Sequence, residues 1–388
     1  MAGLDVALPE VMRRTLLVAS LVGTAAIALF AARAGATRAV EGLFNRGSAP
    51  IEVGRTPRGL GGTDAEACTS CHAEIGEEWT SSMHRAAWTD PVFQSAFREE
   101  PLEACRNCHA PLREPGEEPS GVAAHEGVSC STCHVRDGRV LGVGRTHGAP
   151  HPVERVPDMA RSEYCAGCHQ FDFPSERRTA RGHPASGEPM QDSYEEWALS
   201  DAAAEGVQCN GCHMPRVRGR DGSMHASHRF LGTRDEDFLR SAVALDARAH
   251  REGDEVVVEL RVIPRAIGHA FPTGDLFRRG ELRAWADDGT EASPIALARE
   301  FVDAPERMPD GTLAFVRRQR GDSRVSPPGL GDPPVHTLRL ETAADRVHVA
   351  LDHLLMPTPL AASQGFSQAR VRRTLHEVTI VVEEEGTR

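Results

Sequence analysis

The sequence predicts two folded parts after a leader: a region of short helices and loops, then an antiparallel β-sandwich. Three observations support this prediction. An uncharged run lies near the start of the chain, at Thr15–Ala32. All ten cysteines lie between positions 68 and 212, and short runs of alternating apolar residues begin near Val243. The expected segments are therefore a leader at 1–34, a Gly- and Pro-rich linker at 35–66, a cysteine-bearing domain at 67–239 and the β-sandwich at 240–388.

The leader combines Arg13 and Arg14 with an 18-residue uncharged run and small residues after it. The apolar run of a signal peptide usually has about 7–15 residues, whereas a membrane-spanning helix needs about 17–25. We expect a cleaved signal peptide, with a retained transmembrane helix that attaches the protein to the membrane as the alternative. Either leader would export the rest of the chain, to the periplasm or the periplasmic face of the inner membrane.

The predicted secondary structure changes character along the chain. EIGEEW (74–79) and SYEEWALS (193–200) each predict a short amphipathic helix. Six later runs alternate apolar and polar residues and are separated by Pro, Gly and Asp, which is typical of antiparallel strands. These runs are 255–263, 281–286, 312–318, 335–341, 346–351 and 376–384.

One pentapeptide, C-x-x-C-H, occurs five times and uses all ten cysteines. It is the attachment signature of c-type haem: the two thiols form thioethers with the porphyrin, and the adjacent histidine binds the iron. We therefore predict five covalently attached haem c groups. The attachment residues are Cys68, Cys71, Cys105, Cys108, Cys130, Cys133, Cys165, Cys168, Cys209 and Cys212, and the proximal iron ligands are His72, His109, His134, His169 and His213.

Other uses of paired cysteines fit less well. Zinc sites also use C-x-x-C pairs, but they do not require a histidine after every pair, and five pairs cannot be divided evenly among four-cysteine sites. The C-x-x-C spacing is poor for structural disulfides, and thioredoxin-like pairs occur in a βαβ context that is absent here. The five motifs share 146 residues, about 29 each, so the haems must lie in contact. We therefore expect the first domain to be a multihaem cytochrome c domain.

The amino-acid composition indicates which cofactors and partners suit this protein. Aromatic residues make up only 5% of the chain, which fits an interior filled partly by porphyrins. The net charge of −12 argues against nucleic acid as a partner, because phosphate binding requires a basic surface. All 44 basic residues are arginines, which removes lysine from every mechanistic role.

The second axial ligand separates an electron carrier from an enzyme, because an iron with two protein ligands has no free position for a substrate. Thirteen histidines lie outside the motifs. From their local context we predict distal ligands at His84, on a helix after the first motif, and at His125, His228 and His269, the last in a turn between strands. Either His147 or His151 should supply another, with His183 in reserve. We expect His336, His348, His353 and His376 to be ordinary residues of the β-domain.

Several segments together resemble a multihaem cytochrome family. They are CTSCHAEIGEEWTSSMHRAAWTDPVF, HEGVSCSTCH, the series MQDSYEEWALS, GVQCNGCHMP and HRF, and GHAFPTGDLFRRGEL, within residues 66–285. The family is related to the tetrahaem cytochrome c of nitrifying bacteria, in the form with a C-terminal β-domain. This resemblance implies electron transfer and haems with two histidine ligands, and it places His84, His125, His228 and His269 at family-typical positions.

The wider superfamily also contains enzymes, from which this chain departs. Pentahaem nitrite reductase and octahaem tetrathionate reductase use a lysine ligand, and the chain has none. Hydroxylamine oxidoreductase cross-links a tyrosine to its active haem, and only Tyr164 and Tyr194 occur here.

The sequence thus favours an electron carrier over an enzyme. We expect extracytoplasmic electron transfer from a quinol-oxidising or dehydrogenase donor to a downstream redox protein. The alternatives are an oxidoreductase of small nitrogen or sulfur oxyanions at one open-face haem, and a haem-based sensor or assembly scaffold.

Overall fold

The computed structural model describes residues 50–384, apart from 115, 145–147, 174–187, 308–310 and 312. The leader run, His147 and His183 therefore lie outside the described residues. In the part of the chain that is described, no helix is long and apolar enough to cross a membrane. Contacts group Arg46–Arg388 into one compact unit, and the boundary expected near residue 240 stays a prediction.

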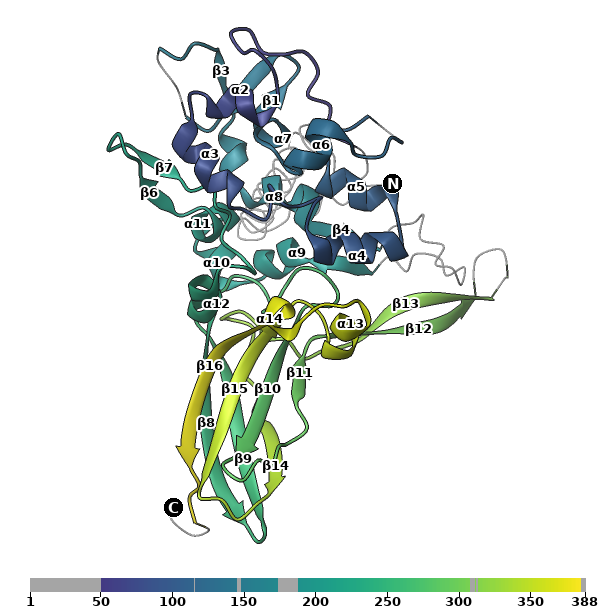
Figure 1. The fold of residues 1–388 in the computed structure, drawn as a ribbon, viewed down its shortest axis with the longest axis vertical. Coiled ribbons are helices and arrows are strands. Elements are labelled where there is room, and N and C mark those ends of the chain that lie inside the picture. Colours follow the sequence, from purple (N-terminus) through teal and green to yellow (C-terminus); the bar gives the residue numbers. More distant parts are fainter. Residues whose placement is uncertain are drawn as a thin grey trace, which may run out of the picture. The chain divides into compact units, whose positions relative to one another are not determined.

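The region before residue 243 is built from short helices (Figure 1). The helices α5, α7, α8 and α11 each end on the histidine of a C-x-x-C-H motif, so the two cysteines, three residues apart, lie on one helical face. The bounds are α2 Ala65–Thr69, α3 Ala73–Thr80, α4 Pro91–Glu99, α5 Glu103–His109, α6 Gly121–Glu126, α7 Cys130–His134, η1 Pro157–Ala160, α8 Ser162–His169, α9 Ser193–Ala198, α10 Asp201–Ala204, α11 Cys209–His213 and α12 Glu236–Ala242.

Side-chain caps fix where two of these helices begin. The Asp64 carboxylate accepts a hydrogen bond from Ala67 N at the start of α2, and Asp90 caps α4, whose first residue is Pro91. Three small sheets connect the helices. Their strands are β1 Val135–Arg136, β2 Arg139–Gly142 and β3 Val153–Arg155; β4 Gln170–Asp172 and β5 Pro189–Asp192; and β6 Arg216–Arg218 and β7 Met224–Ala226.

Longer antiparallel strands form the C-terminal region (Figure 1). One sheet has the order β11-β10-β15-β16, a second has the order β14-β9-β8, and β12 pairs with β13 alone. The strands are β8 Val243–Glu252, β9 Glu255–Pro264, β10 Arg279–Ala286, β11 Ile295–Leu297, β12 Arg299–Arg307, β13 Leu313–Asp322, β14 His336–Glu341, β15 Arg346–Leu354 and β16 Arg372–Val381; α13 Thr358–Ser363 and α14 Gln368–Val371 follow β15.

A shared apolar core joins the four-stranded and three-stranded sheets. Alternate residues of β10 are buried, among them Leu282 and Ala284, and they cluster with Val258 and Leu260 of β9 and with Val349 of β15. The period of two follows from strand geometry, because successive side chains point to opposite faces. A second cluster places Val92 of α4 against buried Leu355, Met356, Ala361 and Val371.

The strand predictions are confirmed for all six runs, and both predicted helices form as α3 and α9. The structure does not confirm a closed β-sandwich, because the strands divide among separate sheets of four, three and two. The helix predicted around His84 is wrong. That residue lies in a series of turns after α3. Its carbonyl oxygen accepts a hydrogen bond from Val128 N at 2.9 Å, and a partner so far away in the chain could not be predicted from the local sequence.

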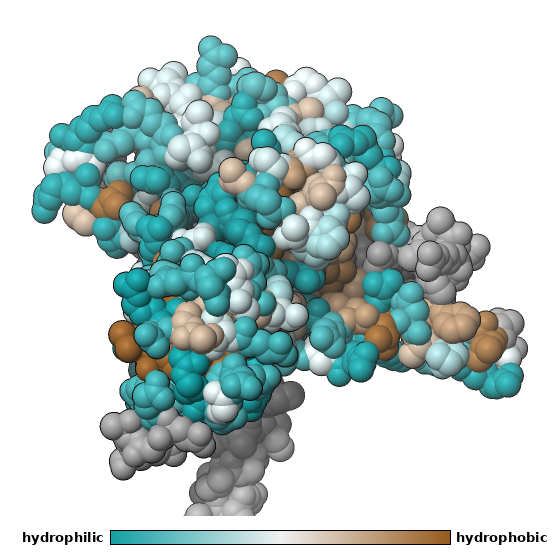
Figure 2. Space-filling model, turned by 60° about the horizontal axis from the view of Figure 1, so that its bottom comes forward, coloured by the Kyte–Doolittle hydropathy of each residue, from teal (hydrophilic) through white to brown (hydrophobic). Residues whose placement is uncertain are grey.

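The surface in Figure 2 is mostly hydrophilic, with hydrophobic residues scattered over it. Some of them lie along the β12–β13 hairpin, which extends to one side in Figures 1 and 2 and carries the exposed Val302 and Leu313. At its base, Arg299 donates hydrogen bonds to the carbonyl oxygens of Pro189 and Met190, which fastens the hairpin to β5.

Candidate haem-binding sites

Four of the five motif histidines face a second imidazole ring within the described residues. The ring centroids of His213 and His269 lie 6.1 Å apart with 12° between the ring planes. The other pairs are His72 with His151 at 6.4 Å, His84 with His169 at 6.2 Å and His134 with His228 at 6.2 Å. Each pair joins one predicted proximal ligand to one predicted distal candidate.

The distance between the ring centroids shows whether a haem iron would fit between the two imidazoles. A metal–imidazole bond is about 2 Å long, and roughly 1.2 Å more separates each nitrogen from its ring centre, so two imidazoles on opposite sides of one metal would have centroids about 6.4 Å apart. The four observed separations, from 6.1 to 6.4 Å, agree with that value. The residues therefore fit two-histidine ligation of four haems.

Hydrogen bonds select the nitrogen that each ring presents. The Nδ1 atoms of His134 and His213 lie 2.9 and 2.6 Å from the carbonyl oxygens of Leu141 and Leu231. A carbonyl can only accept, so Nδ1 carries the proton and Nε2 keeps its lone pair for the iron. The distal candidates follow the same rule: Nδ1 of His228 and His269 face the carbonyl oxygens of Ala226 and Ala270 at 2.8 and 3.0 Å.

Burial keeps these imidazoles neutral. It lowers the pKa of His84 to about 3, and it lowers the pKa of His169, His228 and His269 to about 4 in each case. Nearby histidines lower the pKa further. A neutral ring is the form that binds a metal, so the rings are ready to ligate at neutral pH.

His109, the histidine of the second motif, differs from the other four. Its Nδ1 lies 2.7 Å from the carbonyl oxygen of Ala87, and the Phe93 ring stacks on it at 3.7 Å. No described histidine faces it at the spacing of the four pairs. Burial lowers its pKa, while the nearby carboxylates of Asp275 and Asp90 act in the opposite direction.

Among the described residues, no second imidazole is paired with His125. It ends up near Arg85, whose Nη2 lies 2.6 Å from His125 Nε2 and whose Nη1 donates to the His125 carbonyl oxygen. Its role as a ligand stays a prediction. Of the two alternatives, His151 lies opposite the proximal candidate His72, and His147 lies outside the described residues.

The four histidines expected to belong to the β-domain all lie on strands there. His336 is on β14, His348 and His353 are on β15, and His376 is on β16. His353 is unusual among them, because its side chain is fully buried and neither ring nitrogen has a hydrogen-bond partner among the described residues.

Cysteines of different motifs contact one another. The thiols of Cys68 and Cys130 are within hydrogen-bonding contact, and so are those of Cys108 and Cys168. The third such contact joins Cys165 to Cys209. The fold therefore places the attachment points of the first and third, second and fourth, and fourth and fifth motifs side by side.

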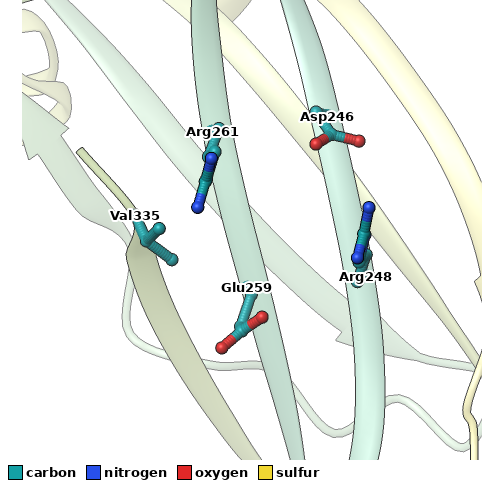
Figure 3. Close-up of a pocket in the computed structure, with 5 residues that line it drawn as sticks. All are labelled: Asp246, Arg248, Glu259, Arg261 and Val335. Atoms are coloured by element: carbon teal, nitrogen blue, oxygen red, sulfur yellow. The ribbon is translucent and has the colours of Figure 1, made fainter. Parts of the chain in front are cut away.

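A small charged hollow lies elsewhere, on the face of β8 and β9 that points away from the core. It is lined by Asp246, Arg248, Glu259, Arg261 and Val335, and Figure 3 shows the first four in two opposed rows. The register pairs Asp246 with Arg261 and Arg248 with Glu259. This hollow contains neither histidine nor cysteine, so its chemistry does not match a haem site.

Two comparisons with known proteins found similar cytochromes c. The family described as cytochrome c554 and c-prime matches residues 67–135. The fold is similar to the crystal structure of a penta-heme cytochrome c552 from Thermochromatium tepidum, with a TM-score of 0.61 and 18% sequence identity, over 81% of this chain and 98% of that one. No curated protein matches the sequence. These findings support a multihaem c-type cytochrome. At this identity, the structural match shows the fold alone.

The groups that orient the ligands have no sequence signature. Backbone carbonyl oxygens hold three of the proximal rings. Those of Ala87 and Leu231 lie 22 and 18 positions from their histidines in the chain, and that of Leu141 lies 7 positions away. Because every residue has a backbone carbonyl, no side-chain pattern could have identified them.

Proposed function

We propose that this protein carries electrons outside the cytoplasm through five covalently attached, closely packed haems. The observation that supports this most directly is the set of four imidazole pairs with centroids 6.1 to 6.4 Å apart. When bound, haem supplies iron that changes oxidation state without releasing a product. Two protein ligands hold such an iron in one coordination state, which suits electron transfer rather than substrate binding.

The contacts between motifs support a continuous path. They connect the first motif to the third and the fourth motif to both the second and the fifth. The third motif adjoins the fourth through Cys133, whose pKa is raised by burial and by the nearby Cys168. Cys71 of the first motif and Cys212 of the fifth are exposed, so we propose that electrons enter and leave at these two ends.

The expected partners are a quinol-oxidising or dehydrogenase donor and a downstream acceptor, in the periplasm or at the periplasmic face of the inner membrane. The five complete motifs are the basis for the number of haems, and the export-type leader run is the basis for the location.

A pyridine haemochrome assay on the matured protein tests the proposal. It should return five haems per chain, which should remain attached after denaturation. Stopped-flow mixing with a chemical reductant and then with a chemical oxidant should reduce and reoxidise all of them without a substrate. Three or fewer covalent haems would overturn the proposed count. Turnover of nitrite or hydroxylamine at a rate matching electron flow would replace the carrier with an enzyme.

A further inference from the structure

The tripeptide Glu-Glu-Trp occurs twice, at 77–79 on α3 and at 195–197 on α9. Each copy lies on a short helix that follows a C-x-x-C-H motif in the chain: α3 comes after the motif ending at His72, and α9 after the motif ending at His169. The haem motifs themselves do not explain this repeat, yet the two copies make matching contacts.

The tryptophans hold two other attachment motifs. Trp79 Nε1 donates a hydrogen bond to the carbonyl oxygen of Val128 at 2.9 Å, and Trp197 Nε1 donates to that of Val207 at 2.9 Å. Each valine stands two residues before the first cysteine of a motif, the third motif in one case and the fifth in the other. The two helices thus fix the chain just before these attachment points.

A glycine precedes each valine and sets the direction of its carbonyl group. Gly127 has φ of 58° and Gly206 has φ of 79°, in the left-handed region that other residues rarely adopt. At Gly127 a side chain would also collide with the backbone, because a Cβ atom would lie 2.7 Å from the carbonyl oxygen of His84.

The second glutamate of each copy holds a distal histidine. Glu78 Oε2 accepts a hydrogen bond from the backbone N–H of His228 at 2.8 Å. Glu196 Oε2 accepts one from Ala270 N, directly after His269, at 3.1 Å. A carboxylate is a strong acceptor for backbone N–H groups, so the same position of the repeat holds a ligand loop in both copies.

These contacts converge on the same sites. Trp79 holds the third motif, and Glu78 holds His228, which faces the histidine of that motif. Trp197 holds the fifth motif, and Glu196 holds the loop of His269, which faces the histidine of that one. One helix in each copy therefore contacts both the attachment motif and the opposing ligand loop.

We propose that Glu78 and Glu196 are positioning residues, which set the orientation of the sixth-ligand histidines His228 and His269. The inference rests on the proposed function, because it concerns the ligands of two of its haems. It adds that each Glu-Glu-Trp helix is a clamp built around one haem site, used twice in the chain.

The environment of the two carboxylates fits this role. Their side chains are only 16% and 12% exposed, and the remaining oxygens also have partners: Glu78 Oε1 lies 3.1 Å from His225 Nε2, and Glu196 Oε1 lies 2.5 Å from Arg324 Nη2. Arg324 in turn donates to the carbonyl oxygen of Pro272, three residues beyond His269. Both carboxylates are therefore fixed at each oxygen.

The first glutamate of each copy provides a matched control. Glu77 is 60% exposed and pairs with Arg220 at the surface, and Glu195 is exposed. The side chain of neither residue contacts a ligand loop among the described contacts. Substitution of Glu77 or Glu195 changes the same net charge on the same helix without touching a distal histidine.

The experiment compares Glu78→Ala and Glu196→Ala in the haem-loaded, full-length protein by electron paramagnetic resonance of the oxidised state. His228→Ala and His269→Ala first identify the low-spin signal that belongs to each site. We expect Glu78→Ala to shift or broaden only the signal lost in His228→Ala, and Glu196→Ala only the signal lost in His269→Ala. Glu→Gln variants, which keep an acceptor oxygen, should restore most of the native signal.

Glu77→Ala and Glu195→Ala should leave every signal unchanged. Native spectra in both Glu78→Ala and Glu196→Ala, or equal changes in the controls, would overturn the proposal. If the alanine variants do not mature, Glu78→Asp and Glu196→Asp decide: the shortened carboxylates should shift the same two signals, and native spectra would count against the clamp. A pyridine haemochrome count of five in these variants separates failure of the clamp from failure of the proposed function.

Discussion

The rings of His213 and His269 lie nearly parallel, 12° apart, with their centroids separated by 6.1 Å. The first ends α11, and the second lies between β9 and β10. An iron–nitrogen bond at each ring would fasten the strand-rich C-terminal region to the haem-binding helices. Such bonds would couple haem ligation to the stability of the fold.

His269→Ala should keep all five covalent haems, because attachment requires only the cysteines, but should convert one haem to high-spin or water-ligated iron. The reason is that the ring opposite His213 is removed. Electron paramagnetic resonance and a haemochrome count measure both effects. His348→Ala is the control, since that ring contacts Asp287 and Thr379 in the β-domain. A spectrum that stays low-spin throughout would show that His269 is not a ligand.

At least four haems should be low-spin in the oxidised protein, one for each imidazole pair. Two neutral nitrogen ligands give iron a strong ligand field, which favours the low-spin state. Spin quantitation by electron paramagnetic resonance, normalised to the haemochrome count, makes the measurement. Two or more equivalents of high-spin iron would contradict the ligand assignment from the four pairs.

His353→Leu should stabilise the protein, and the gain should grow in acid. Burial lowers the pKa of His353 to about 3, with nearby Arg278 and Arg373 acting in the same direction. Since the unfolded ring titrates near 6.5, the unfolded chain binds a proton that the folded chain excludes, and stability falls as the pH drops from about 6.5 towards 3.

The wild type should therefore lose on the order of 1 kcal/mol per pH unit more than His353→Leu between pH 6 and pH 4. At pH 7 the variant should already gain about 1 kcal/mol, because two buried ring nitrogens without hydrogen bonds are removed. Thermal melts across this pH range make the measurement, with His250→Leu as a surface control. Parallel pH profiles for wild type and His353→Leu would refute the explanation.

Asp352→Ala should destabilise the protein by about 3 kcal/mol without altering the haem spectra. The carboxylate is fully buried and binds Arg283 Nε at 2.6 Å, Thr374 Oγ1 at 2.7 Å and Arg372. Its removal leaves two arginines without their shared anion. Asp303→Ala is the matched control, since its pair with Arg317 is 31% exposed on each side and such pairs contribute about 0–1 kcal/mol. Equal losses in the two variants would contradict this account.

Local sequence was sufficient for the chemistry of attachment. The spacing within C-x-x-C-H places both thiols and one imidazole about one helical turn apart. Each motif can therefore be recognised from five consecutive residues, wherever it lies in the fold. The β-strands were also predictable where apolar residues alternate, as in 255–263. The strands β8 and β12 were not predicted, because charged residues and alanine interrupt their alternation.

The pairing of ligands depended on tertiary structure. His228 faces His134 and not the histidine of the motif nearest to it in sequence, and His151 faces His72, because the loops between these residues bring the rings together. The ligand role of His125 stays a prediction; in the structure, Arg85 Nη2 lies 2.6 Å from its Nε2.

The sequence by itself determined where the candidate haem-attachment motifs lie, which histidines stand beside the thiols, and which segments can form short helices or strands, because those properties depend on residues a few positions apart. Only the tertiary structure decided which second imidazole faces four of the motif histidines and which carboxylate holds two of the opposing loops. Glu78 and His228 are 150 positions apart in the chain, and their hydrogen bond exists only because α3 and the segment after β7 pack together.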